Sequence, residues 1–169
     1  MREPTIMTKN ILIDDDDADV VELLTRRCQS LGWNVDSANN AMTALGKAEE
    51  NLPDVVILDV EMPQGNGLSV CEMMSNHEQL RSIPVIMLTS SSSESTVRRC
   101  HELCAYYVLK CPNVWPRIEP ILHELTGSLE SGEGSKMPQH TAETSERAEL
   151  AATRLMDAVF ATIGVEDGE

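Results

Sequence analysis

The chain of 169 residues is long enough for one ordinary domain with its own hydrophobic core and a tail, which argues against a multidomain enzyme. Its 28 acidic and 13 basic side chains give a formal net charge of -15, and because no compact basic patch interrupts this excess, we expect no binding to nucleic acid. No apolar run is long enough for a secretion signal or a membrane span, and the five cysteines include no CxxC pair. We therefore expect a cytoplasmic protein with reduced thiols that does not bind a membrane.

Short apolar segments alternate with segments of helical periodicity, and this alternation is typical of parallel βαβ units. Strands are predicted at residues 10–14, 33–37, 54–59, 83–88 and 105–109. Three of them are almost wholly apolar, as expected for strands that are covered by helices on both faces. The sequence therefore predicts an α/β fold with a doubly wound, five-stranded parallel sheet.

The helical segments complete a (βα)5 pattern. The first helix is expected to bury a face formed by Val20, Val21, Leu24, Cys28 and Leu31. It should end at Gly32, a residue that suits a left-handed C-cap. Weaker amphipathic segments occupy residues 40–50, 67–76 and 94–103. A fifth helix is expected before Gly127, with an apolar face formed by Ile118, Ile121, Leu122 and Leu125. One domain should therefore span residues 8–126.

The remaining residues form a tail of two parts. Residues 127–140, "GSLESGEGSKMPQH", have the Gly, Ser and charge content of a flexible linker. Residues 141–163 carry an apolar stripe at helical spacing and predict an amphipathic helix. Because an exposed apolar stripe is unfavourable, we expect this helix to dock on the domain, on a second copy of the chain as a homodimer, or on a partner protein. The tail is too short and too acidic for a DNA-binding domain.

Polar residues stand at the ends of four predicted strands: the run Asp14 to Asp17 after the first, Asp59 at the third, Thr89 after the fourth and Lys110 after the fifth. In an open parallel sheet these ends border one ligand crevice. Clustered carboxylates stay ionised only if they share a cation, and an all-oxygen ligand set suits Mg²⁺. An aspartate beside such an ion can act as a nucleophile in phosphoryl transfer.

The stretches "ILIDDD", "PDVVILDVEMPQGNGL", "VIMLTS" and "AYYVLK" occur in this order over about residues 8–126. Together they resemble the motifs of receiver domains of two-component response regulators, a CheY-like family with a flavodoxin-like fold. In this family the second residue of the acidic pair stands at typical distances before the glycine that follows the first helix and before the acceptor aspartate. These two distances select Asp15 and Asp16 as the acidic pair. Asp17 and Asp19 are then expected to begin the helix.

The resemblance implies a metal and acceptor site. Asp59 would accept a phosphoryl group, Asp16 and Asp59 would ligate Mg²⁺ directly, Asp15 would act through water, and Glu61 would offer its backbone carbonyl. The phosphoryl donor would be a sensor histidine kinase or a histidine phosphotransfer protein. The expected function is that of a stand-alone response regulator, a signalling protein rather than an enzyme, with self-catalysed phosphoryl transfer and hydrolysis.

The resemblance also implies a switch. Thr89 and Lys110 would bind the phosphoryl oxygens, and Tyr107 would turn inward as Thr89 moves. A downstream protein partner would read the surface of the fourth helix, fifth strand and fifth helix. That surface is expected to include Val97, Arg98, His101, Tyr107 and Trp115.

Three residues depart from the family pattern. Asp14 replaces an apolar residue, and we expect it either to be partly buried with a raised pKa or to be drawn into the acidic pocket. Cys111 stands between Lys110 and the proline that usually follows the lysine through a cis bond, which puts the reach of the lysine in question. Cys104 replaces a common glycine.

Two other functions are compatible with the sequence. The altered lysine loop would suit a receiver-like interaction module that works without phosphorylation. An aspartyl nucleophile with an acid two residues later, Asp59 and Glu61, would suit a Mg²⁺-dependent phosphatase, although no cap domain is present to enclose a substrate. Turnover of a generic phosphate ester separates the phosphatase from the receiver.

Overall fold

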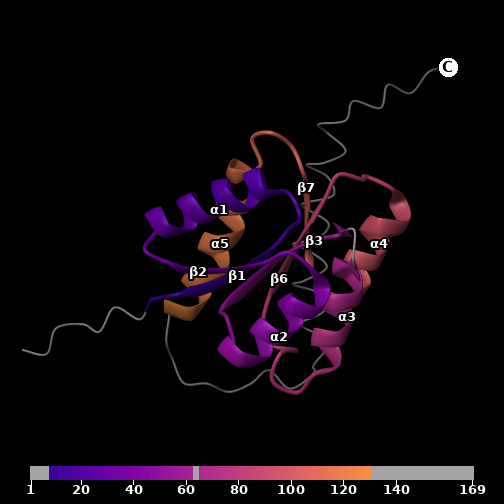
Figure 1. Ribbon diagram of the computed structural model, residues 1–169, viewed down its shortest axis with the longest axis horizontal. Coiled ribbons are helices and arrows are strands. Elements are labelled where there is room, and N and C mark those ends of the chain that lie inside the picture. Colours follow the sequence, from indigo (N-terminus) through magenta and orange to yellow (C-terminus); the bar gives the residue numbers. More distant parts are fainter. Residues whose placement is uncertain (1–7, 63–64, 131–169) are drawn as a thin grey trace, which may run out of the picture. The chain divides into compact units, whose positions relative to one another are not determined.

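The computed structural model describes residues 8–62 and 65–130, and its main feature is a five-stranded parallel sheet (Figure 1). Its strands are β1 (Asn10–Asp14), β2 (Asn34–Ala38), β3 (Val55–Asp59), β6 (Val85–Thr89) and β7 (Tyr106–Leu109). The strand order is β2-β1-β3-β6-β7, so the chain reverses its direction of winding between β1 and β3. This confirms the predicted doubly wound α/β fold, with strand limits that differ from the prediction by up to two residues.

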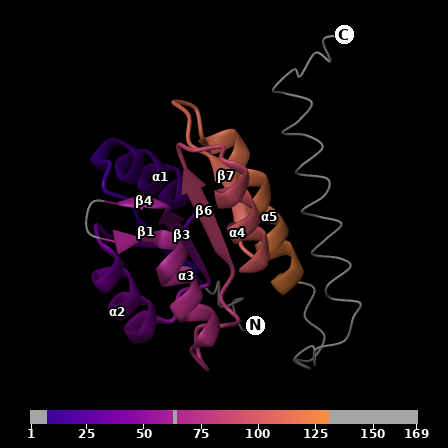
Figure 2. The ribbon, with the colours of Figure 1, turned by 90° about the vertical axis from the view of Figure 1, so that its right-hand side faces the viewer.

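Helices cover both faces of the sheet (Figures 1 and 2). They are α1 (Ala18–Ser30), α2 (Ala41–Asn51), α3 (Gly67–Asn76), α4 (Glu94–Glu102) and α5 (Trp115–Glu130). One hydrophobic core joins the sheet to α1 and α5, and the other joins it to α2, α3 and α4. Within the described residues, no helix has the length and hydropathy needed to cross a membrane.

The strand β1 shows how the sheet serves both cores. Ile11 and Ile13 belong to the core beneath α1 and α5, whereas Leu12 belongs to the core beneath α2, α3 and α4. Side chains alternate between the faces of a strand, so both faces must be apolar when both are covered. The same alternation places Asp14 on the face of Leu12.

The helix α1 begins and ends as predicted. The Asp17 side chain caps it by accepting hydrogen bonds from the backbone N–H groups of Asp19 at 3.0 Å and Val20 at 3.4 Å. At its other end Leu31 is followed by Gly32, whose φ of +80° lies in the left-handed region that glycine adopts without strain.

Two parts of the chain differ from the sequence prediction. The helix α5 continues through Gly127, where we predicted its end and the start of the linker, to Glu130. A glycine costs about 1 kcal/mol inside a helix but keeps its N–H donor, so it does not by itself end one. The loop after β3 contains a two-stranded antiparallel sheet, β4 (Glu61–Met62) and β5 (Gly65–Asn66), which is too short to leave a periodic signal. The rest of the linker and the predicted helix at 141–163 lie outside the described residues.

The exposed residue Cys104 terminates α4 in a strained backbone conformation. Its N–H donates a hydrogen bond to the carbonyl of His101 at 3.0 Å, and its φ is +55°. The left-handed conformation brings Cβ close to the following carbonyl oxygen and costs about 1–2 kcal/mol for a residue other than glycine. The departure from glycine noted in the sequence therefore carries a cost in stability.

The variant Cys104→Gly is expected to raise the free energy of unfolding by about 0.5–1 kcal/mol, because the relieved strain exceeds the added entropy of the unfolded chain. Urea denaturation of the full chain measures the change. Cys104→Ala, which keeps the Cβ atom, is the matched control and should show no gain. Equal stability of the alanine and glycine variants would contradict the assigned strain.

Candidate functional site

The carboxyl ends of four strands bring a set of polar side chains together. Asp15 directly follows β1, Asp59 and Thr89 are the last residues of β3 and β6, and Lys110 directly follows β7. Asp15, Asp59 and Thr89 are 2%, 1% and 0% exposed. The site lies at the switch point between β1 and β3, where open parallel sheets bind their ligands.

Three carboxylates form a group that can hold a metal ion. Oxygen atoms of Asp15, Asp16 and Asp59 all lie within 4.8 Å of one another, with Asp16 exposed and the other two buried. The Oδ2 atom of Asp15 is buried and has no hydrogen-bond partner. Carboxylate oxygens are the ligands that Mg²⁺ prefers, and three carboxylates this close together repel one another unless cations neutralise them. The residues present therefore fit Mg²⁺.

The ammonium group of Lys110 joins the two buried carboxylates. Its Nζ atom donates hydrogen bonds to Oδ1 of Asp15 and Oδ2 of Asp59, both at 2.9 Å. Nζ is also 2.9 Å from Oδ2 of Asp15, but that contact lacks the geometry of a hydrogen bond. In the described part of the chain no peptide bond is cis, so Cys111 and Pro112 follow the lysine through trans bonds. The inserted Cys111 does not prevent the lysine from reaching the site.

The carboxylates at this site carry more negative charge than Lys110 neutralises. Burial raises the pKa of Asp59 to about 6, although hydrogen bonds from Lys110 and the Glu61 N–H oppose the shift. Burial likewise raises the pKa of Asp15. Burial alone would lower the pKa of Lys110, but its two carboxylate partners raise it above the ordinary value. A bound cation would relieve the repulsion that remains.

Glu61 contacts the site in a way that the sequence did not predict. Its backbone N–H donates to Oδ1 of Asp59 at 3.0 Å. Its carboxylate accepts hydrogen bonds from Ser90, at 3.0 Å from N and 2.5 Å from Oγ, and from Oγ1 of Thr89 at 3.3 Å. Hydrogen bonds, first of all from the Ser90 side chain, hold the pKa of Glu61 below its usual value. The sequence indicated only the backbone carbonyl of Glu61 as a ligand.

Tyr107 and Thr89 share one acceptor. The Tyr107 hydroxyl donates to the carbonyl oxygen of Ser91 at 3.2 Å. Oγ1 of Thr89 lies 3.1 Å from the same oxygen, which is an alternative acceptor to Glu61 for its single hydroxyl hydrogen. Tyr107 is half-buried and packs against the core beneath α2, α3 and α4. The structure thus connects the predicted switch tyrosine to the predicted hydroxyl residue through one carbonyl group.

Asp14 is fully buried and neither of its carboxylate oxygens has a hydrogen-bond partner. Burial, followed by the charges of Asp15, Asp59 and Asp16, raises its pKa to about 6. It does not belong to the three carboxylates whose oxygens gather within 4.8 Å. Of our two expectations, burial with a raised pKa is the one that the structure supports.

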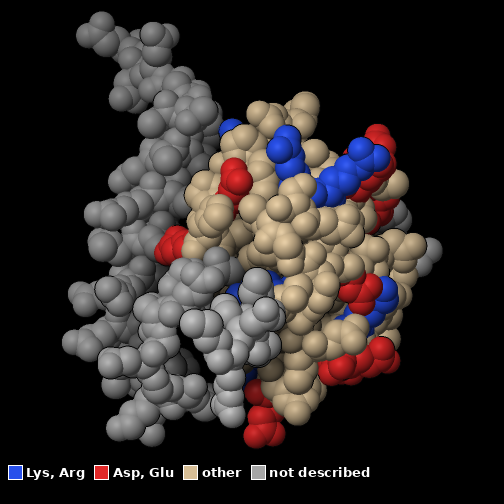
Figure 3. Space-filling model, turned by 90° about the vertical axis from the view of Figure 1, so that its left-hand side faces the viewer, with Lys and Arg blue, Asp and Glu red and all other residues tan. Residues whose placement is uncertain are grey.

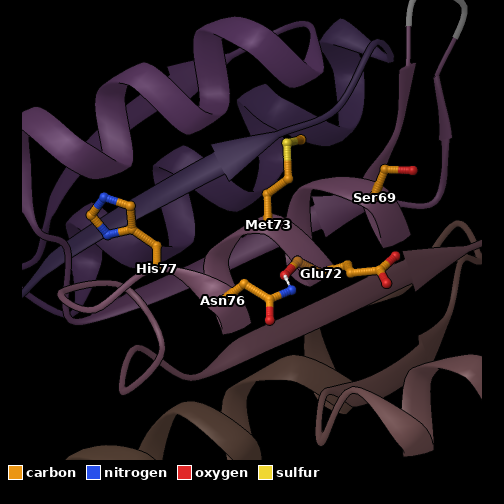
Figure 4. Close-up of a pocket in the computed structure, with 5 residues that line it drawn as sticks. All are labelled: Ser69, Glu72, Met73, Asn76 and His77. Carbon is orange, nitrogen blue, oxygen red and sulfur yellow. Dashed lines mark hydrogen bonds between the residues drawn. The ribbon is translucent and has the colours of Figure 1, made fainter.

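Two surface pockets and the distribution of surface charge were compared with the predicted site. A shallow pocket on α3 is lined by Ser69, Glu72, Met73, Asn76 and His77 (Figure 4). There the Asn76 amide donates to the backbone carbonyl of Glu72 at 2.9 Å. One face of the protein shows basic side chains scattered among acidic ones, without a continuous basic patch (Figure 3). A second depression includes Asp15 and Asp16 and continues between α1 and the loop after β2.

Asp14→Val is expected to raise the free energy of unfolding by about 2–3 kcal/mol at pH 7.5 in the presence of a chelator, and by less at pH 4. The pKa of Asp14 rises from 3.8 to about 6 on folding, so the folded state binds this proton more tightly than the unfolded state. The wild type therefore loses stability as the pH rises from 4 to 6, and the variant escapes that loss.

Urea denaturation at the two pH values tests this prediction, with Asp14→Asn separating charge from polarity. The affinity of the valine variant for Mg²⁺ should remain close to that of the wild type. If Asp14→Val stabilised the protein no more at pH 7.5 than at pH 4, the conclusion that the wild type buries a charged Asp14 at pH 7.5 would be contradicted.

Mg²⁺ is expected to stabilise the folded chain by about 1.4–2.7 kcal/mol at ten to a hundred times its dissociation constant, and a chelator should reverse the effect. Because protonated Asp59 is a poor ligand, the stabilisation should be largest at pH 7.5 and should fade as the pH falls through about 6. Thermal unfolding with and without Mg²⁺ measures the effect. The variant Asp16→Ala removes one proposed ligand and should be stabilised less by Mg²⁺. An unchanged midpoint for the wild type at pH 7.5 would refute the metal site.

Solved structures support the fold assignment. The chemotaxis response regulator CheY4 of Vibrio cholerae aligns with a TM-score of 0.64 and 24% identity, over 70% of this chain and 99% of that one. The response regulator TrrA of Thermotoga maritima, in complex with Mg(2+)-BeF, aligns with a TM-score of 0.63 and 30% identity, over 70% of this chain and 99% of that one.

Curated relatives and a family match identify the family. The transcriptional regulatory protein PhoP of alkaline phosphatase synthesis in Bacillus subtilis is 36% identical over 88 residues, which are 52% of this chain and 36% of PhoP. The polar-differentiation response regulator DivK of Brucella ovis is 29% identical over 116 residues, 68% of this chain and 94% of DivK. Residues 11–118 match the response regulator receiver domain. The chain therefore belongs to the response regulator receiver family of two-component signalling proteins.

Proposed function

We propose that this protein is a stand-alone response regulator that accepts a phosphoryl group on Asp59 from a phosphohistidine partner and then binds a downstream protein. The observation that carries the proposal is the placement of Asp59. This buried carboxylate lies 2.9 Å from the Lys110 ammonium and belongs to a carboxylate group that fits Mg²⁺. The match to 94% of the length of DivK supports a receiver that works without a second domain.

The proposed reaction is a phosphoryl transfer. An oxygen of Asp59 attacks the phosphorus of phosphohistidine, a P–O bond forms, and the P–N bond breaks. The electron pair of that bond passes to the imidazole nitrogen of the donor, which takes up a proton. Lys110 stabilises the charge on the transferred group, and the Thr89 hydroxyl at the end of β6 is a further donor for its oxygens.

The acidic residues have separate proposed roles. Asp16 and Asp59 would hold Mg²⁺ directly, Asp15 would do so through water, and Glu61 would contribute its backbone carbonyl. The ion would neutralise the clustered carboxylates and shield the negative phosphoryl group. The similarity to TrrA, whose structure contains Mg(2+)-BeF, supports this assignment.

The proposed switch starts at Thr89. If its hydroxyl turns to the phosphoryl group, it leaves the Ser91 carbonyl that it shares with Tyr107. Tyr107 can then turn inward and change the surface of α4, β7 and α5. Arg98 and His101 are exposed there, but Trp115 is only 6% exposed and belongs to the core beneath α1 and α5, so our expectation that it lies on this surface was wrong.

The two alternative functions receive less support. The case for an interaction module without phosphorylation rested on Cys111, and Lys110 reaches both carboxylates despite that insertion. A phosphatase would need Glu61 as a proton donor, but hydrogen bonds from Ser90 lower the pKa of its carboxyl and favour the ionised form.

Incubation with Mg²⁺ and acetyl phosphate is expected to add one phosphoryl group to the wild type and none to Asp59→Asn, because the amide is a poor nucleophile. Intact mass measures the adduct. Asp19→Asn, a change of an exposed aspartate on α1, is the matched control and should be labelled like the wild type. Labelling of Asp59→Asn would place the acceptor elsewhere, and repeated turnover of a generic phosphate ester would favour the phosphatase.

A further inference from the structure

The Glu61 side chain holds the donors at the end of β6. Its carboxylate accepts hydrogen bonds from the N–H and the hydroxyl of Ser90 and from the hydroxyl of Thr89, at 3.0, 2.5 and 3.3 Å. Glu61 is exposed, and these partners lie 28 and 29 positions away in the sequence. A flexible exposed side chain with three such hydrogen bonds has a specific position rather than a solvated one.

These donors lie beside Asp59. In the sheet, Asp59 pairs with Leu88, and Thr89 and Ser90 follow directly. The N–H of Val60 also donates to the carbonyl of Leu88 at 2.7 Å, which fixes the two strand ends to each other. The carboxylate of Glu61 therefore connects the segment after β3 to the end of β6.

A phosphoryl group on Asp59 would need donors from the same places. The ammonium of Lys110 and the N–H of Glu61 already contact the Asp59 carboxylate. The Thr89 hydroxyl and the Ser90 N–H are the adjacent donors at the end of β6, and both lie within hydrogen-bond distance of the anionic side chain of Glu61. Two anions cannot share these donors without repulsion.

We propose that the Glu61 carboxylate is an internal anion that occupies the phosphoryl-oxygen donors in the unphosphorylated protein and must leave them when Asp59 is phosphorylated. Glu61 is then a positioning residue with an autoinhibitory contact, which slows phosphorylation and holds Thr89 away from the acceptor. This inference rests on the proposed function of Asp59.

The contact also extends to the switch. The Thr89 hydroxyl has Glu61 at 3.3 Å and the Ser91 carbonyl at 3.1 Å as alternative acceptors for its single hydrogen, and the Tyr107 hydroxyl donates to the same carbonyl. Displacement of the Glu61 carboxylate therefore frees Thr89 from one of its partners in the unphosphorylated arrangement. By linkage, whatever weakens this contact makes the binding of an anion at Asp59 more favourable.

The test compares wild type, Glu61→Ala and Glu61→Gln in their binding of beryllofluoride, an anion that mimics a phosphoryl group, at saturating Mg²⁺. Isothermal titration measures the dissociation constant, and intact mass follows the rate of labelling by acetyl phosphate. Glu61→Ala is expected to bind beryllofluoride about tenfold more tightly, as for the loss of one competing charged hydrogen bond, and to be labelled faster. Glu61→Gln, which keeps the length of the side chain but not its charge, should show a smaller gain.

Glu50→Ala is the matched control, because it removes the same charge from an exposed position on α2. It should bind beryllofluoride like the wild type. Affinity for Mg²⁺ alone gives a second readout: loss of the Glu61 charge should leave it unchanged or lower it, whereas the affinity for beryllofluoride rises. A merely structural role of Glu61 would not raise the affinity for beryllofluoride while the affinity for Mg²⁺ stays equal or falls.

Equal beryllofluoride affinity of wild type and Glu61→Ala would overturn the inference and leave the proposed function intact. An equal gain in Glu50→Ala would also overturn it, because the effect would then come from net charge. If none of the proteins bound beryllofluoride or were labelled, the proposed function of Asp59 would fail and the inference with it.

Discussion

The site depends on the burial of two like-charged carboxylates, Asp15 and Asp59, against one shared ammonium group. Burial, which disfavours the charged form, is the main cause of the raised pKa of both groups, and the charge of Asp15 adds to the shift of Asp59. Lys110 donates one hydrogen bond to each carboxylate and also lies 2.9 Å from Oδ2 of Asp15, so a single ammonium group faces two carboxylates. The site therefore carries an excess of negative charge, and its carboxylates suit the binding of a divalent cation.

The fold meets this constraint by bringing separate strand ends together. The carboxyl ends of parallel strands lie at the same end of the sheet. Because β3 and β6 are neighbours in the sheet, Asp59 and Thr89 lie close together although they are far apart in the sequence. Close packing also fixes the end of β3. A Cβ atom on Gly67, the first residue of α3, would lie 2.1 Å from the carbonyl oxygen of Asp59, so only glycine fits there. The helix α3 therefore begins in direct contact with the backbone of Asp59.

Much of the architecture was predictable from local patterns. Strands buried on both faces must be apolar along their length, as the three central strands β1, β3 and β6 are, and the alternation of apolar and helical segments located the two outer strands. The alternatives for Asp14 could not be separated in this way, because its burial depends on which helices cover the same face. The hydrogen bonds of Glu61 were missed for a similar reason: they join residues that are 28 and 29 positions apart and leave no periodic signal. The end of α5 was misplaced because glycine weakens a helix without always ending it.

By itself, the sequence determined the order of strands and helices along the chain and the polar residues at four of the strand ends. Both follow from short-range periodicity and from the motifs of the receiver family. Only the tertiary structure decided where the long side chains reach. Lys110 has several rotatable bonds, and its contacts with Asp15 and Asp59 span 95 and 51 positions of the chain. The same holds for the Glu61 carboxylate at the end of β6. Such contacts are selected by the packing of the whole sheet and by the mutual electrostatics of the buried groups, which no local stretch of sequence encodes.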